Sequence, residues 1–168
     1  IFYLSGVDQE ESILILFPDA KNSIYKEILF LKETNEHIAI WEGSKLSKNQ
    51  ATAVSGVQTV YWLSDFDSIF DTLMKEAKTV YFNNNNHYRK AVEMETRVDR
   101  FIKHVKSNYP KHTIQNNFSI MESLRGVKEP EEIELIRKAC NITEKGFRRV
   151  LGFVEPGVME YEIEAEYA

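Results

Sequence analysis

The stretch Thr59–Phe82, which reads TVYWLSDFDSIFDTLMKEAKTVYF, decides the fold class. Its two ends, residues 59–63 and 79–82, are short runs of β-branched and aromatic residues, a composition typical of buried strands. Residues 64–77 predict a helix, because their large apolar side chains recur at helical spacing: Phe66, Ile69, Phe70 and Leu73. A strand, a helix and a second strand in this order indicate an α/β domain.

Further strands and helices flank this stretch on both sides. Residues 12–17 (SILILF) and 27–31 (EILFL) are compact apolar runs that predict two buried strands. Residues 47–54 predict a short helix with Ser47 as its N-cap, and residues 91–109 predict a longer helix. This alternation of strands and helices indicates one α/β domain with a largely buried sheet.

From Lys128 onward the sequence changes to a long helical pattern. Pro130 fits the first turn of a helix, where its missing N–H costs no hydrogen bond. The stripe that follows recurs at helical spacing and consists of Ile133, Ile136, Cys140, Thr143, Phe147, Val150 and Leu151. Because the single cysteine, Cys140, falls on this stripe, we expect it to pack in a core rather than to act as a catalytic thiol.

The change of pattern predicts a domain boundary near residue 127. Residues 1–127 then form the α/β domain, and residues 128–168 begin a second domain. The sequence opens without Met and stops within a helix that starts at Glu160. We therefore expect the first domain to lack its opening residues and the second domain to be truncated.

Composition disfavours several classes of function. The net charge is −5 and no stripe of Lys and Arg runs along the sequence, so we expect no nucleic-acid partner. No apolar run approaches the roughly 20 residues needed to span a bilayer, so we expect no membrane association. A single cysteine favours a reducing compartment, and no signal peptide opens the sequence. These features predict a cytoplasmic location.

Four segments, found in the same order, carry a resemblance to a known family. They are FYLSG (residues 2–6), IAIWEGSKL (38–46), ESLRGVKEPEEIELIRKACNITEKGF (122–147) and EPGVMEYEIEAEY (155–167). Together they resemble the creatinase and aminopeptidase P superfamily, and the third segment is the most specific. The resemblance implies a non-catalytic N-terminal α/β domain with a mixed β-sheet flanked by helices, in which FYLSG forms a strand and a turn. The first helices of a truncated "pita-bread" metallopeptidase domain would follow.

The resemblance implies a function for the parent protein rather than for this chain alone. The parent would be a metal-dependent Xaa-Pro aminopeptidase, a hydrolase that releases the N-terminal residue from X-Pro peptides. Two divalent metals, expected to be manganese, would be held by two Asp, one His and two Glu, all of them downstream of residues 155–167. This chain would then contain no catalytic residue, metal ligand or cofactor, and would be inactive by itself. Its domain would support a homo-oligomer and narrow the access of X-Pro peptide substrates.

Three residues are candidates for a supporting role. Trp41 resembles a position at which oligomeric family members offer a tryptophan toward the substrate cleft of a neighbouring subunit. Packing of this indole at the end of a sheet explains Trp41 equally well. Arg125 and Lys128 lie at the predicted junction, and we expect them to brace the two domains against each other.

Other polar groups have a simpler interpretation than a metal site. The four histidines show no metal-ligand spacing and occur singly, at His37, His87, His104 and His112. Four carboxylates alternate near the end of the sequence, at Glu160, Glu162, Glu164 and Glu166. We expect these carboxylates to form a solvated face, with pairing partners in the part of the parent protein that follows.

Two further hypotheses stay open at this point. A prolidase, which cleaves X-Pro dipeptides, has the same architecture as an Xaa-Pro aminopeptidase. A pseudo-peptidase binding module, of the kind found in the large subunit of a histone chaperone, has the same two domains without the metal ligands. The presence or loss of the metal-ligand set downstream would distinguish an enzyme from a binding module.

Overall fold

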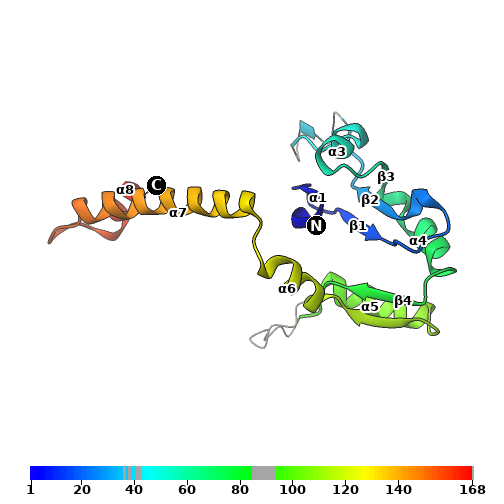
Figure 1. Ribbon diagram of the computed structural model, residues 1–168. Helices are drawn as coiled ribbons and strands as arrows, with labels where there is room; N and C mark the ends of the chain where they lie inside the picture. Colours follow the sequence, from blue (N-terminus) through cyan, green and yellow to red (C-terminus); the bar gives the residue numbers. More distant parts are fainter. Residues whose placement is uncertain (36, 38, 41–42, 85–93, 168) are drawn as a thin grey trace. The chain divides into compact units, whose positions relative to one another are not determined.

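The computed structural model describes residues 1–35, 37, 39–40, 43–84 and 94–167. It divides into two compact units, Ile1–Asn116 and Asn117–Ala168 (Figure 1). The described strands all belong to the first unit, whereas the second consists of helices and the loops that join them.

A three-stranded sheet forms the centre of the first unit. Strand β2 (Glu27–Leu31) lies between β1 (Ile13–Leu16), which is antiparallel to it, and β3 (Thr59–Trp62), which is parallel to it. Each strand lies within an apolar run from which it was predicted. The predicted α/β fold with a mixed sheet is therefore confirmed.

A second, two-stranded sheet pairs β4 (Thr79–Phe82) in parallel with β5 (Thr113–Asn116). Strand β5 was not predicted, because its sequence TIQN contains a single large apolar residue. Side-chain amides hold its end in place. The Asn116 amide donates to the carbonyl oxygen of Asn84 at 3.0 Å, and the Asn84 amide donates to the carboxylate of Asp99 at 3.2 Å.

The helix predicted for residues 47–54 is present as α3 (Lys48–Ser55). Ser47 is its N-cap, and the Ser47 hydroxyl accepts a hydrogen bond from the backbone N–H of Gln50 at 3.4 Å. The Gln50 side chain in turn accepts from the Ser47 N–H at 2.9 Å, which completes a capping box. Gly56 ends the helix with φ of 76°, a left-handed conformation that glycine adopts without strain.

The helix predicted for residues 91–109 begins later, as α5 (Arg97–Asn108). Thr96 fixes this start, because its hydroxyl accepts from the Asp99 N–H at 3.1 Å and its own N–H donates to the Asp99 carboxylate at 3.0 Å. Residues 91–93 of the prediction lie outside the described residues. The hydrogen bonds between Thr96 and Asp99 therefore fix the start of α5, which the apolar periodicity alone did not define.

Helices α4 (Phe66–Met74) and α5 cover one face of the strands. A short 3₁₀ turn, η2 (Leu63–Asp65), leads from β3 into α4. Aromatic rings fill the space beneath the helices: the Phe30 and Phe66 ring centroids lie 5.2 Å apart, edge to face. The buried residues of this cluster are Ile28, Phe30, Phe66, Phe70, Leu73, Met74 and Val105.

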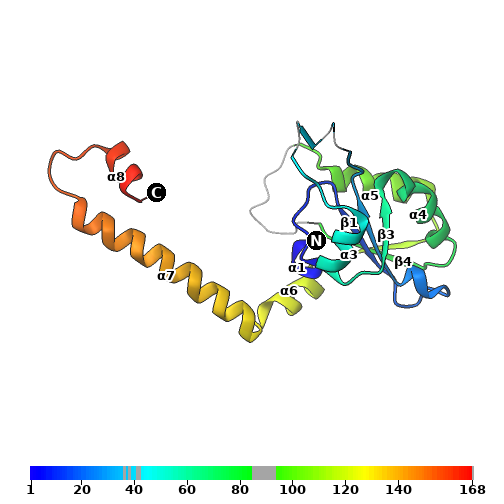
Figure 2. The ribbon, with the colours of Figure 1, turned by 90° about the horizontal axis from the view of Figure 1, so that it is seen from above.

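Helix α3 and the segment around Val7 cover the opposite face of the three-stranded sheet (Figure 2). Because side chains alternate along a strand, the neighbours of Ile28 and Phe30 on β2 point to this second side. The buried residues of the second cluster are Val7, Leu29, Leu31, Ala51 and Val57. The first unit is therefore layered, with helices on both faces of a buried sheet.

Two short turns complete the first unit, and one of them departs from the expectation. Residues Phe2–Ser5 form a helical turn, α1, so the expected strand at FYLSG is wrong. Gly6 closes this turn in a left-handed conformation with φ of 67°, and its N–H donates to the Phe2 carbonyl at 2.7 Å. The other turn is the 3₁₀ helix η1 (Ser23–Tyr25), between β1 and β2.

The second unit contains α6 (Phe118–Gly126), α7 (Pro130–Phe153) and α8 (Glu160–Tyr167). The long helix and the last helix begin where they were predicted, whereas α6 was not predicted. No side chain of these three helices is buried. Among the described helices, none is both long and apolar enough to cross a membrane.

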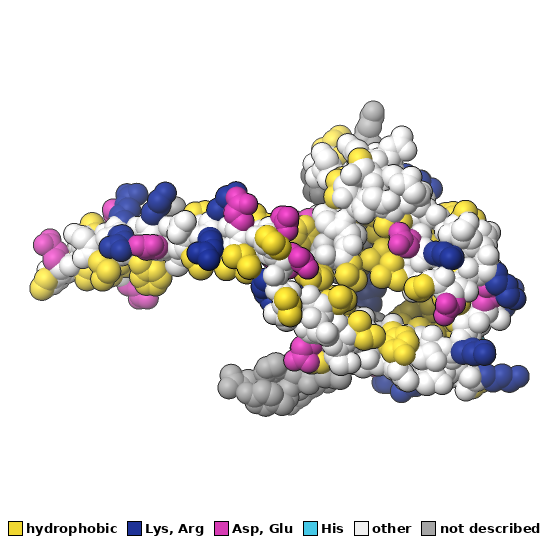
Figure 3. Space-filling model, in the orientation of Figure 1, with side chains coloured by type: hydrophobic (Ala, Val, Ile, Leu, Met, Phe, Trp, Pro, Cys, Tyr) yellow, Lys and Arg dark blue, Asp and Glu magenta, His cyan; other side chains and the backbone are white. Residues whose placement is uncertain are grey.

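Helix α7 carries an uncovered apolar band. Hydrophobic side chains follow the lower edge of this helix in Figure 3, and Lys and Arg side chains gather on its upper edge. The exposed large hydrophobic residues of the predicted stripe are Ile133, Ile136, Phe147 and Leu151. Cys140 lies on the same helix and is exposed, so its expected place in a core is wrong within this chain.

The division between the compact units falls between Asn116 and Asn117, eleven residues before the predicted boundary after residue 127. The difference corresponds to α6, which groups with α7 and α8 rather than with the sheets. The predicted domains, 1–127 and 128–168, remain a prediction about the parent protein.

Replacing Phe30 with alanine should lower the free energy of unfolding by about 3–5 kcal/mol, because the ring is fully buried and leaves a cavity. Urea unfolding followed by circular dichroism measures the change. Val54→Ala is the matched control: Val54 is 52% exposed on α3, and its truncation should cost less than about 1 kcal/mol. Equal losses for the two variants would contradict the central role of Phe30.

Candidate functional site

Of the three residues singled out from the sequence, two are described by the structure and one is not. Trp41 lies outside the described residues. Arg125 and Lys128 are both exposed, at the end of α6 and in the connection that follows it. Their proposed bracing of two domains, and the role of Trp41 in subunit contact or substrate access, stay predictions.

The structure gives Lys128 a local role at this connection. Its ammonium group donates to the carbonyl oxygen of Arg125 and approaches that of Gly126 at 3.4 Å. These are carbonyls of the last turn of α6, which lack partners within the helix and sit at its negative end. On the other side, the Glu129 N–H donates to the Glu132 carboxylate at 3.0 Å, at the start of α7. The short connection therefore caps the helix on either side of it.

Two carboxylates of α8, Glu162 and Glu166, have partners within the second unit. Glu166 accepts a hydrogen bond from Arg149 of α7 at 2.5 Å, and this bond together with the charge of Glu166 raises the pKa of Arg149. Glu162 accepts from the N–H of Met159 at 2.9 Å, at the start of α8. The expectation that such partners lie only downstream is therefore wrong for Glu166.

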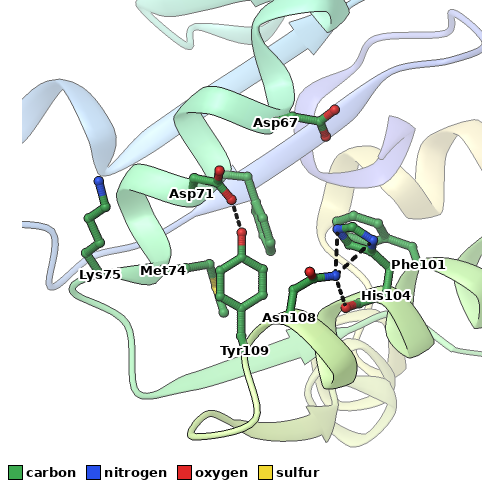
Figure 4. A pocket seen from close by; sticks show the side chains of 9 residues that line it. Asp67, Asp71, Met74, Lys75, Phe101, His104, Asn108 and Tyr109 are labelled. Atoms are coloured by element: carbon green, nitrogen blue, oxygen red, sulfur yellow. Dashed lines mark hydrogen bonds between the residues drawn. The ribbon is translucent and has the colours of Figure 1, made fainter.

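A pocket of about 530 Å³ opens between α4 and α5 on the first unit (Figure 4). Helix α4 contributes residues one turn apart along one side, and α5 contributes the opposite side. The lining residues are Asp67, Phe70, Asp71, Met74, Lys75, Phe101, His104, Asn108 and Tyr109. The volume lies within the range of small-ligand sites in proteins.

Hydrogen bonds and ring contacts hold most of the lining side chains. The Tyr109 hydroxyl donates to Asp71 across the two helices. The Asn108 amide donates to the carbonyl oxygen of His104 at 2.9 Å. The His104 ring stacks on Phe101 with an interplanar angle of 11° and centroids 6.1 Å apart. Asp67, by contrast, is exposed and makes no hydrogen bond or ion pair with any described residue.

His112 supports the pocket from behind through Met74. Its Nε2 lies 2.7 Å from the carbonyl oxygen of Met74, the last residue of α4, and its Nδ1 is buried without a hydrogen-bond partner among the described residues. A carbonyl accepts but cannot donate, so Nε2 carries the proton. His112 thereby satisfies one of the carbonyls that the end of α4 leaves unpaired.

Replacing His112 with phenylalanine should lower the free energy of unfolding by about 1–3 kcal/mol, because the Met74 carbonyl loses its donor while a ring is retained. Thermal or urea unfolding measures the loss. His104→Phe is the control with the same change of side chain: His104 is exposed, so that variant should stay within about 0.5 kcal/mol of the parent chain. A His112→Phe variant as stable as the parent chain would refute the capping role.

The described residues do not fit a metal site. Within the part of the chain that the structure describes, no three His, Cys, Asp or Glu side chains gather closely enough to hold a metal ion. His37 and His104 are exposed, His112 binds Met74, and His87 lies outside the described residues. The two metals that the resemblance implies therefore have no ligand set among these residues.

Comparison with known proteins assigns the fold. Residues 1–81 match the family model "Aminopeptidase P, N-terminal domain". Xaa-Pro aminopeptidase of Haemophilus influenzae is 24% identical over 98% of this chain and 36% of its own length. Intermediate cleaving peptidase 55 of Schizosaccharomyces pombe is 22% identical over 89% of this chain and 31% of its own. A structure from Bacillus anthracis assigned to aminopeptidase P superposes with a TM-score of 0.88 and 30% identity, over 99% of this chain and 39% of that one.

The fold and these matches define the class as the N-terminal part of a two-domain peptidase. Residues 1–81 match the model of the aminopeptidase P N-terminal domain, and the whole chain is similar to the N-terminal part of aminopeptidase P-like proteins. It spans about a third of the length of the curated relatives it matches. The resemblance found in the sequence is confirmed.

The pocket between α4 and α5 was missed by the sequence analysis. The sequence does hold one signal, since Asp67 and Asp71 on α4, and His104 and Asn108 on α5, are each four residues apart. This spacing places each pair on one face of its helix. Nothing in the sequence indicates that the two faces meet.

Proposed function

We propose that this chain is the non-catalytic N-terminal part of a metal-dependent Xaa-Pro aminopeptidase, an enzyme that releases the first residue from X-Pro peptides. One observation carries the proposal: the similarity to the Haemophilus influenzae Xaa-Pro aminopeptidase covers nearly all of this chain but only 36% of that enzyme. The described residues offer no metal ligand set. The chemistry is therefore assigned to the remaining part of a longer protein.

The metals of the parent enzyme are proposed to be two divalent ions, with manganese as the native metal. A zinc-substituted aminopeptidase P of Escherichia coli has been solved in complex with product, and this chain shares its fold with a TM-score of 0.77. When bound, such ions would activate a water molecule for attack on the peptide bond. The residues of this chain take no direct part in that step.

The contribution of this chain itself is proposed to be structural. The exposed apolar band of α7 offers a surface against which the rest of a catalytic domain can pack, since contiguous exposed apolar surface marks interaction sites. The layered first unit supplies a rigid body that can form oligomer contacts and narrow the approach to an active site. A homo-oligomer is proposed from the family resemblance, and a cytoplasmic location from the single cysteine.

A peptidase of different specificity is the second candidate. The Schizosaccharomyces pombe relative is named an intermediate cleaving peptidase and matches 89% of this chain. A prolidase and an inactive binding module share the architecture as well. Substrate choice separates these alternatives, because each of them predicts a different set of cleaved peptides.

The test compares this chain with the full-length protein that contains it. Both are incubated with manganese and three substrates: an X-Pro tripeptide, an X-Pro dipeptide and an X-Leu tripeptide. We expect the full-length protein alone to cleave the X-Pro tripeptide, and a chelator to abolish its activity until manganese is restored.

The other outcomes are equally informative. Cleavage of the dipeptide alone would indicate a prolidase, and preference for the proline-free X-Leu peptide would indicate a peptidase that does not require proline. Inactivity of the full-length protein would favour a binding module. Activity of the 168-residue chain by itself would overturn the assignment of the chemistry to the missing part.

A further inference from the structure

The pocket between α4 and α5 has a lining that nothing in the peptidase assignment uses. We propose that it binds the guanidinium group of an arginine side chain presented by a partner protein. The inference rests on the pocket alone, so it stands or falls independently of the proposed catalytic function.

Two carboxylates give the pocket its charge complementarity to a cation. Asp67 and Asp71 are four residues apart on α4, about 6 Å along the helix axis. Like charges at this spacing repel each other. Asp67 has no partner among the described residues, and Tyr109 occupies only one carboxylate oxygen of Asp71. A cation between the two carboxylates would satisfy their free oxygens and relieve the repulsion.

The ring surfaces favour a planar cation over a compact one. His104 lies flat on Phe101, and Phe70 approaches Phe101 with ring centroids 5.4 Å apart. A guanidinium group stacks on flat rings and donates two parallel hydrogen bonds to one carboxylate, whereas a lysine ammonium group does neither. The Asn108 amide nitrogen is already engaged by the His104 carbonyl, which leaves its oxygen as a further acceptor.

The ammonium group of Lys75, which also lines the pocket, does not prevent a guanidinium group from binding there. The carboxylates of Asp67 and Asp71 and the ammonium group of Lys75 together leave one net negative charge on the pocket lining. Figure 4 shows Lys75 at the far end of the pocket from His104, with Asp71 between Lys75 and Asp67. A cation that enters between Asp67 and His104 therefore avoids the ammonium group.

A partner polypeptide is a better source of the guanidinium group than free arginine. The pocket is open to solvent and its rim residues Asp67, His104 and Asn108 are exposed, so a side chain can enter from outside. Free arginine also carries an α-ammonium and an α-carboxylate group, whose interactions with Asp67 and Asp71 oppose each other and for which the guanidinium contacts described above assign no partner. In a peptide that carboxylate is an uncharged amide.

The experiment titrates the 168-residue chain with acetyl-Gly-Arg-Gly-amide and follows the backbone amides by NMR. Shift changes should centre on the lining residues of α4 and α5. The citrulline peptide, which has the same shape without the charge, should bind about tenfold more weakly or not at all, and so should the lysine peptide. Free L-arginine should bind several-fold more weakly than the peptide.

Two variants and two matched controls locate the site. Asp67→Asn should weaken the arginine peptide about tenfold, whereas Asp65→Asn, the same change just outside the pocket, should stay within about twofold. His104→Ala removes the flat ring and should weaken binding several-fold, whereas Lys106→Ala on the same helix should not. Circular dichroism confirms that each variant folds.

Several results would overturn the proposal. Absence of shift changes at about 10 mM peptide would exclude the site, because even a weak millimolar complex would then be populated. Equal binding of the citrulline or lysine peptide would exclude guanidinium recognition. Equal losses of affinity for Asp65→Asn and Asp67→Asn would show that net charge, rather than the position of Asp67 in the pocket, controls binding. Equal affinity for free arginine would indicate that the ligand of the pocket is a small molecule rather than a partner protein.

Discussion

Burial of strand β2 on both faces is the constraint on which the first unit depends. Four consecutive residues, Ile28 to Leu31, are completely inaccessible to solvent. Because side chains alternate along a strand, these four residues contribute side chains to two separate apolar clusters, one on each face of the sheet. One cluster requires α4 and α5 as a cover and the other requires α3, so the layered arrangement follows from a single five-residue strand.

The same constraint shapes the pocket. Phe70 and Met74 belong to the buried cluster over β2 and also form part of the pocket wall. Their positions are fixed by the core, because protein interiors are close-packed and give little room for adjustment. His112 secures the last carbonyl of α4 from the side of β5. The polar residues at the rim of the pocket, Asp67, His104 and Asn108, are therefore positioned by helices that pack tightly against the core, although their own side chains are exposed.

The sequence predicted those elements whose signal is local and apolar. Strands β1 to β4 and helices α4 and α7 each contain enough large hydrophobic residues to define their own periodicity, whereas α3 was predicted from its N-cap, Ser47. Strand β5 does not, because its place depends on pairing with β4, more than thirty residues earlier. The start of α5 depends on the capping hydrogen bonds between Thr96 and Asp99 rather than on the apolar periodicity of the sequence. Phe2–Ser5 forms a helical turn that Gly6 closes, although the family resemblance implied a strand there.

The candidate site was less accessible to sequence reasoning than the fold. Arg125 and Lys128 were chosen from their position at a junction, and the structure gives Lys128 a capping role that only the path of the backbone reveals. Arg149 and Glu166 are seventeen residues apart, so their pairing requires the turn between α7 and α8. The pocket requires two helix faces to meet across thirty residues of sequence. Each of these features depends on tertiary packing, on which a local pattern carries no information.

The two units differ in what holds them together, and this difference bears on how the chain works. The first unit has two buried clusters, whereas the three helices of the second unit bury no side chain. A 24-residue helix with one apolar side obtains most of its stability from packing of that side rather than from helix propensity. The contacts between α7 and α8, among them Phe147 with Tyr167, cover only its C-terminal half. The apolar side chains of α7 nearer Pro130, among them Ile133 and Ile136, stay exposed, so this part of the helix is a surface on which a further packing partner can bind.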